Sequence, residues 1–289
     1  MIGNKTLFVT SLYSKLGDTK FGGRIGRIHH YLGSLKTILN MDQDFVIYTS
    51  DIEEKELIES SIDMVKYKDK IRIILYDLNS HPNHEYFQEK LDGFNKMDAH
   101  RCYEIMHSKT TWMNNHINEN YDFIYWIDCG LSHGGLFPLK YRGGVDTFTN
   151  HFKCSLFTPK IVENLNKCTD KITLLSGDQS YHLFDSSAND KFFTDVVKDT
   201  KYHIIGGMFG GPKNLVINLI NEYQIAFNKM IEFDVLHREE QLLSYLFMKD
   251  KDLYNQLIFT TWHHEDSDMA QYNIENEIYF YNVFENLNK

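Results

Sequence analysis

Three segments of the chain carry residues suited to binding a phosphate-bearing ligand. Asp128 ends an almost wholly apolar run, Tyr121–Asp128 (YDFIYWID). An acidic residue at a strand end can hold a divalent cation that clamps a diphosphate, although an aspartate that only caps the next turn would look the same. Arg24 and Arg27 lie in GGRIGR, where N–H groups at a helix start and two guanidinium groups suit an anionic nucleotide. Residues 206–211 (GGMFGG) would let the backbone approach a ligand closely.

Further candidates could move a proton or hold a cation. Glu239 and Glu240 open the segment EEQLLSYL, and either could be the acid–base group, although helix starts favour carboxylates for electrostatic reasons alone. Lys109 could reach a diphosphate from the helix before Asp128, unless it is simply solvated. His133 could touch a metal or an acceptor, and His264 (WHHE) is a candidate metal ligand, although both could be ordinary loop histidines.

Short β-rich runs alternate with helical patterns, which predicts a mainly parallel sheet covered by helices on both faces. Strands are expected at Thr6–Leu12, Asp44–Thr49, Ile71–Leu78, Tyr121–Asp128, Ile172–Leu175, Tyr202–Ile205 and Leu257–Thr261. Helices are expected at Ile25–Asn40, Pro212–Phe233 and Arg238–Asp250. Another helix is expected to begin after Ser50, which would act as its capping-box residue, and a long helical stretch is expected to end at about Asn118, with a break near Met97. Ligands bind beyond the carboxyl ends of such strands, so Thr10 and Asp51 join the candidate donor-binding residues.

Length and charge limit the organisation and the partners. A chain of 289 residues with no linker or repeat is expected to form one domain over residues 1–289. Its net charge of −10 argues against non-specific binding to nucleic acid or to an anionic membrane. Four scattered cysteines, no signal peptide and no long apolar stretch favour a cytoplasmic protein without a transmembrane segment.

Three of these motifs together resemble a known family. A strand ending in Trp126-Ile127-Asp128, the GGMFGG run and EEQLLSYL are similar to the HtrL/YibB-type (WlaTC-like) bacterial proteins, which are regarded as glycosyltransferases, over nearly the whole chain. The last two motifs also resemble blood-group-type retaining glycosyltransferases. That resemblance implies an acceptor-side role for Gly206, Gly207, Met208, Phe209, Gly210 and Gly211.

Both resemblances imply the GT-A (Rossmann-like) nucleotide-diphospho-sugar transferase fold. The H-x-E register of His237-Arg238-Glu239 puts Glu239 in the place of the essential glutamate of the blood-group-type family. The apolar stripe of the helix favours the same residue, while Glu240 stays an alternative. The GT-A metal motif D-x-D is incomplete, because Asp128 is followed by Cys129 and Gly130. A Mn²⁺ or Mg²⁺ cofactor is still implied, with weaker binding or a replacement ligand.

The expected activity is transfer of a sugar from a nucleotide-diphosphate donor, with a UDP-sugar favoured, to a hydroxyl on a glycan, a lipid-linked sugar or a protein. Asp128 would hold the cation, while Arg24, Arg27 and Lys109 would assist electrostatically. Two alternatives stay open. One is a catalytically silent nucleotide- or sugar-binding protein on the same fold, and the other is a sugar-phosphate nucleotidyltransferase, whose glycine-rich signature usually lies closer to the first strand.

Overall fold

The computed structural model describes residues 4–13, 28–91, 99–131, 157–177, 190–198, 204–259, 283–284 and 286–289. These residues form a seven-stranded sheet of order β3-β2-β1-β4-β6-β5-β7. The strands are β1 (Thr6–Leu12), β2 (Asp44–Thr49), β3 (Ile71–Leu75), β4 (Phe123–Ile127), β5 (Ile172–Gly177), β6 (Ile204–Pro212) and β7 (Tyr254–Phe259).

The first four strands form a parallel half-sheet with β1 at its centre. β1 pairs in parallel with β2 on one side and β4 on the other, and β2 pairs in parallel with β3. The chain therefore runs outward from β1 through β2 to β3, and then returns to the opposite side of β1 to form β4. This reversal of strand order is a topological switch point, where α/β proteins bind ligands beyond the carboxyl ends of the strands.

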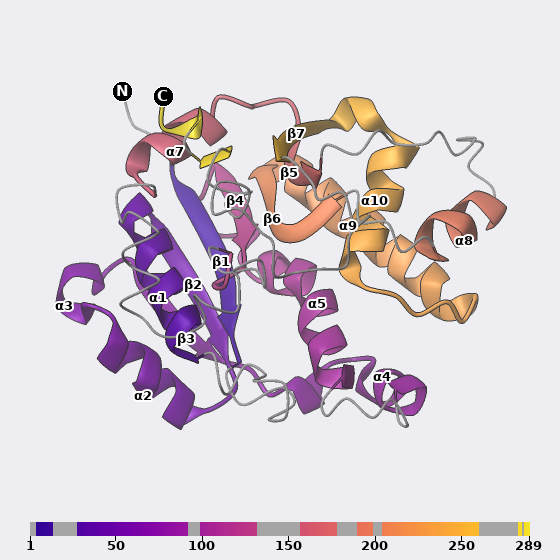
Figure 1. The fold of residues 1–289 in the computed structure, drawn as a ribbon, viewed down its shortest axis with the longest axis horizontal. Coiled ribbons are helices and arrows are strands. Elements are labelled where there is room, and N and C mark those ends of the chain that lie inside the picture. Colours follow the sequence, from indigo (N-terminus) through magenta and orange to yellow (C-terminus); the bar gives the residue numbers. More distant parts are fainter. Residues whose placement is uncertain are drawn as a thin grey trace, which may run out of the picture.

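Helices cover both faces of the sheet (Figure 1). They are α1 (Ile28–Ile38), α2 (Ile52–Ser61), α3 (Met64–Tyr67), α4 (His84–Leu91), α5 (Ala99–Asn114), α7 (Pro159–Leu165), α8 (Asp190–Lys198), α9 (Lys213–Glu232) and α10 (Glu239–Lys249). The core under α5, α9 and α10 contains Trp112, Trp126 and Leu242, while the opposite core under α1, α2 and α7 contains Leu35 and Ile58. No helix among the described residues has both the length and the apolar character needed to span a bilayer.

The fold class predicted from the sequence is confirmed: the protein is an α/β protein with a mainly parallel central sheet between two helical layers. β1 and β2 have the predicted bounds, because both are continuous runs of strand-forming residues whose side chains are almost all buried. Phe8 on β1 stacks between Phe45 and Tyr125 at ring-centroid distances of 5.2 and 5.5 Å, so aromatic contacts join the neighbouring strands β2, β1 and β4.

The expected boundary of the strand at Tyr202–Ile205 was wrong. The glycine run does not follow that strand as a turn, because it forms the body of β6, which is antiparallel to both β4 and β5. At Gly210 (φ 148°) a Cβ atom would overlap the Ile124 carbonyl oxygen, and Gly211 has φ 155°. These glycines therefore permit close strand packing in a conformation that other residues avoid.

The predicted cap of α2 is shifted by one residue. Asp51, not Ser50, is the N-cap, and its Oδ1 accepts a hydrogen bond of 2.9 Å from the backbone N–H of Glu54. The buried Glu54 carboxylate accepts in return from the backbone N–H of Ser50 at 3.1 Å and from the Ser50 hydroxyl at 2.7 Å. The arrangement resembles a capping box with an aspartate as the cap, except that the return bonds come from Ser50, the residue before the cap.

Candidate functional site

A cluster of charged side chains lies at the carboxyl end of β4, beside the switch point of the sheet. Asp128 directly follows β4, and its backbone N–H donates to the carbonyl oxygen of Gly207 on β6 at 2.7 Å. Lys109 comes from α5, and Glu239 from the first turn of α10. Four elements distant in sequence therefore meet at this edge of the sheet.

The Lys109 ammonium is the centre of the cluster. Nζ donates to Glu239 Oε1 at 2.6 Å and to the Gly206 carbonyl oxygen at 2.8 Å, and it forms an ion pair with Asp128 Oδ1 at 3.0 Å. Burial alone lowers the pKa of Lys109, but the charges of Asp128 and Glu239 outweigh it and the pKa is raised. The lysine therefore stays charged inside the protein, a state that buried lysines adopt only when paired.

One oxygen of Asp128 carries all of the contacts that the structure describes for this carboxylate. The Trp126 indole Nε1 donates to Oδ1 at 2.7 Å, on the same atom that faces Lys109. Lys109 Nζ also lies 5.2 Å from the centre of the Trp126 ring, within cation–π range. The described residues form no hydrogen bond to Oδ2, and the Asp128 side chain is 38% exposed. Asp128 is thus held through Oδ1 while part of its side chain remains accessible.

The two neighbouring glutamates have different environments. Glu239 is 3% exposed, and its buried Oε2 has no hydrogen-bond partner among the residues that the structure describes. Glu240 is half-buried, and desolvation, reinforced by the Glu239 charge, raises the pKa of its carboxyl to about 8 in spite of Lys109 and Arg238. The charges of Asp128 and Lys109 also act on the pKa of the Glu240 carboxyl, so both glutamates lie within the electrostatic range of the cluster.

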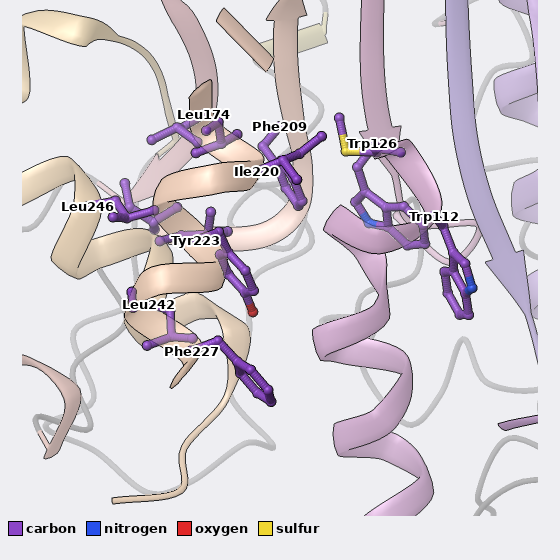
Figure 2. Packing of buried hydrophobic residues seen from close by; sticks show 14 of the residues in the cluster. Trp112, Trp126, Leu174, Phe209, Ile220, Tyr223, Phe227, Leu242 and Leu246 are labelled. Carbon is purple, nitrogen blue, oxygen red and sulfur yellow. The ribbon is translucent and has the colours of Figure 1, made fainter. Parts of the chain in front are cut away.

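A buried histidine supports the start of α10. His107 Nε2 lies 2.9 Å from the His237 carbonyl oxygen, two residues before Glu239, and Nδ1 lies 2.8 Å from the Tyr223 hydroxyl. Since a carbonyl oxygen can only accept, Nε2 carries the proton and Nδ1 accepts from Tyr223. Burial lowers the pKa of His107 to about 3, so the ring is neutral at physiological pH. Figure 2 shows Tyr223 projecting from α9 toward α5, which carries His107.

The glycines of β6 divide into two groups. Gly206 and Gly207 lie at the edge of the sheet beside Asp128, and a Cβ atom at Gly206 would collide with Glu239 Oε1. Gly210 and Gly211 pair with Tyr125 and Ile124 deeper in the sheet. The two residues between the groups, Met208 and Phe209, are 0% and 1% exposed. Of the six candidate acceptor-binding residues, the structure therefore places only Gly206 and Gly207 in the cluster.

Two further candidate donor-binding residues that the structure describes, Thr10 and Asp51, are not hydrogen-bond or ion-pair partners of Lys109, Asp128 or Glu239. Thr10 lies within β1 at 0% exposure, and its hydroxyl has no hydrogen-bond partner in the described part of the chain. Asp51 lies beyond β2 at the same edge of the sheet, but its Oδ1 caps α2 and its Oδ2 accepts from the Ser50 hydroxyl at 3.0 Å. Asp51 therefore has a structural function that does not require a nucleoside.

Four candidates fall outside the described residues, namely Arg24, Arg27, His133 and His264. Within the part of the chain that the structure describes, no three His, Cys, Asp or Glu side chains form a group suited to a metal ion. Asp128, whose side chain is 38% exposed, is the described carboxylate that directly follows β4 and could meet a cation there.

Sequence reasoning missed several members of the site. Trp126 was recognised as a strand residue, but its indole N–H is also a donor to Asp128. His107 and Tyr223 carry no local signal, since 116 residues separate them. A lysine within an otherwise apolar helical stripe would have been the usable signal for burial of Lys109, but α5 is too mixed in composition to show such a stripe.

Comparison with known proteins gives fold-level matches only. No family model and no curated protein sequence matches the chain. Among solved structures, the galactosyltransferase LgtC in complex with donor and acceptor sugar analogues aligns with 86% of this chain and 72% of its own, at 11% identity and a TM-score of 0.41. An active-site mutant of LgtC gives the same values. Similarity at this level is too low to assign a family or an activity to this chain.

Proposed function

We propose that the chain is a glycosyltransferase of the GT-A type, which moves a sugar from a nucleotide-diphosphate donor to a hydroxyl group. The observation that supports this most strongly is the position of Asp128. It directly follows the strand that flanks the topological switch point, where α/β proteins bind ligands, and its side chain is 38% exposed there. The motif resemblance of Asp128, Gly206–Gly211 and Glu239 points to the same activity.

A divalent cation fits this site only with help from the substrate. Asp128 Oδ2 offers one oxygen ligand, whereas Oδ1 already faces Lys109 and Trp126. Mg²⁺ is often held by one or two carboxylates together with substrate phosphates and water. We therefore assign Asp128 as the protein ligand of a Mg²⁺ or Mn²⁺ ion, which would stabilise negative charge on the departing nucleoside diphosphate.

Glu240 is the better placed of the two glutamates to exchange a proton with the acceptor hydroxyl. Its pKa of about 8 lies near neutral pH, where acid–base groups are most effective, and its side chain is half-buried. Glu239 is instead held by Lys109 and is 3% exposed. This assignment reverses the preference for Glu239 that the motif register favours.

The remaining roles follow from position and resemblance. Gly206 and Gly207 line the acceptor side in this proposal, since they lie beside Asp128. Arg24 and Arg27 would neutralise the diphosphate. A uridine diphosphate sugar is the proposed donor because the resemblance points to it, and the acceptor is a hydroxyl on a glycan, a lipid-linked sugar or a protein.

Donor binding is testable by thermal denaturation with a panel of UDP-, GDP- and CDP-sugars, each with and without Mn²⁺. A ligand that binds only the native state stabilises it by RT ln(1 + [L]/Kd), so the correct donor should raise Tm in wild type. Asp128→Asn is the matched variant, and it should lose the Mn²⁺-dependent part of the shift. If no nucleotide sugar raises Tm, or if Asp128→Asn responds as wild type does, the proposed site is wrong.

A further inference from the structure

Lys109 supplies a positive charge from within the fold at a place suited to a metal ion. Its Nζ lies within 3.0 Å of two carboxylate oxygens, Asp128 Oδ1 and Glu239 Oε1, and of the Gly206 carbonyl oxygen. Carboxylate and carbonyl oxygens are the ligands that hard divalent cations prefer. Among the described residues, Lys109 is the one lysine or arginine that is buried.

We propose that the Lys109 ammonium is a resident cation, which occupies a potential divalent-cation position between Asp128 and Glu239 and keeps metal ions out of it. Lys109 is then a positioning residue that neutralises and orients two carboxylates, and it does not contact a diphosphate. Its three N–H donors are matched by the three oxygens within reach, so no donor remains for a phosphate.

Two further observations support this assignment. Among the described residues the buried Glu239 Oε2 has no hydrogen-bond partner, so the contacts that offset the Glu239 charge there run through Oε1 and Lys109. The residue two positions after Asp128 is Gly130, which supplies no second carboxylate at the end of β4. The positive charge from α5 therefore lies beside Asp128 Oδ1, and a metal ion that accompanies a donor is left with Oδ2.

Gly206 provides the space that this arrangement needs. A Cβ atom there would collide with Oε1 of Glu239 and would also lie 3.0 Å from its Cδ. The next residue, Gly207, would direct a Cβ atom away from the cluster, toward Leu131 Cδ1 at 2.8 Å, and the end of that leucine side chain can shift. The two glycines thus allow the same substitution to be compared on opposite sides of one strand.

The first test measures Mn²⁺ binding by calorimetry, without nucleotide, to wild type, Lys109→Ala and the double variant Lys109→Ala/Glu239→Gln. Removal of the ammonium leaves two carboxylates and a carbonyl oxygen around an open space. Lys109→Ala should therefore bind Mn²⁺ at least about tenfold more tightly than wild type, and Mn²⁺ should raise its Tm. The double variant should lose most of this gain, because it lacks one carboxylate.

Three results would overturn the proposal. The first is that Lys109→Ala binds Mn²⁺ no more tightly than wild type does. The second is that the double variant binds Mn²⁺ as tightly as Lys109→Ala does, and the third is that Lys109→Ala stays unfolded with and without Mn²⁺. None of these measurements uses a nucleotide sugar. The proposal is therefore tested even if the chain proves to have no transferase activity.

The second test leaves Lys109 in place and displaces its partner. Gly206→Ala should push the Glu239 carboxylate off the ammonium and lower Tm by at least about 2 °C more than Gly207→Ala does. In a Glu239→Ala background the collision disappears, so the two alanine substitutions should have similar effects. Equal effects in the wild-type background, or an excess that persists without Glu239, would contradict the arrangement.

Discussion

Replacement of Glu240 by glutamine should remove a pH-dependent loss of stability. The pKa of this carboxyl is raised from 4.5 to about 8, first by desolvation and then by the charge of Glu239. Between these two values the native protein holds a proton that the unfolded chain has released. The stabilisation is therefore fully present below about 4.5 and is lost as the pH rises toward 8, with a slope of at most about 1.4 kcal/mol per pH unit.

The slope can be measured by urea unfolding at pH 6, 7 and 8 for wild type and for Glu240→Gln. Glutamine is neutral at every pH, so the free energy of unfolding of the variant should fall less steeply over this range, and its stability relative to wild type should improve with pH. Glu56→Gln is a suitable control, because Glu56 is exposed on α2. Equal slopes in wild type and Glu240→Gln would refute the buried, proton-retaining environment assigned to Glu240.

Substitutions at four positions test the site and the sheet. Asp128→Ala should abolish metal-dependent turnover while leaving the fold intact, and full activity of this variant, or of wild type in excess chelator, would contradict the cation clamp. Glu240→Gln should lower kcat by about 10²–10⁴-fold with little change in the donor KM, whereas Glu239→Gln should act mainly on stability; the reverse kinetic pattern would return the acid–base role to Glu239. Gly210→Ala should lower the free energy of unfolding in urea by about 2 kcal/mol or more, because φ at this position is 148° and a Cβ atom would meet the Ile124 carbonyl oxygen. If the variant unfolds at the same urea concentration as wild type, β4 and β6 can separate at this point.

The parts of the fold that could be predicted are those with a local signal. The apolar runs of β1, β2 and β4 predict buried parallel strands, and their alternation with helical segments predicts the mainly parallel sheet. β6 could not be placed correctly, because a glycine-rich run normally indicates a turn. The reason for its glycines lies in β4 and β5, against which β6 packs closely in an antiparallel direction.

The candidate site shows the same division between local and distant information. Asp128 and Glu239 could be selected from strand-end position and motif register. The burial of Lys109 could not, because its partners Gly206 and Glu239 are 97 and 130 residues away in the chain. The raised pKa of Glu240 likewise depends on desolvation by packing, which no short sequence pattern reports.

The central claim, that this site transfers sugars from a nucleotide donor, is tested most directly by measuring nucleoside diphosphate release. Wild type and Asp128→Asn would be incubated with each member of the nucleotide-sugar panel and Mn²⁺. The proposal predicts release from at least one donor, with a uridine donor expected, and a rate at least about 100-fold lower in Asp128→Asn. Binding without release would indicate a silent binding protein, and release of pyrophosphate from a nucleoside triphosphate with a sugar phosphate would indicate a nucleotidyltransferase. Either of these results, or equal rates in the two proteins, would contradict the claim.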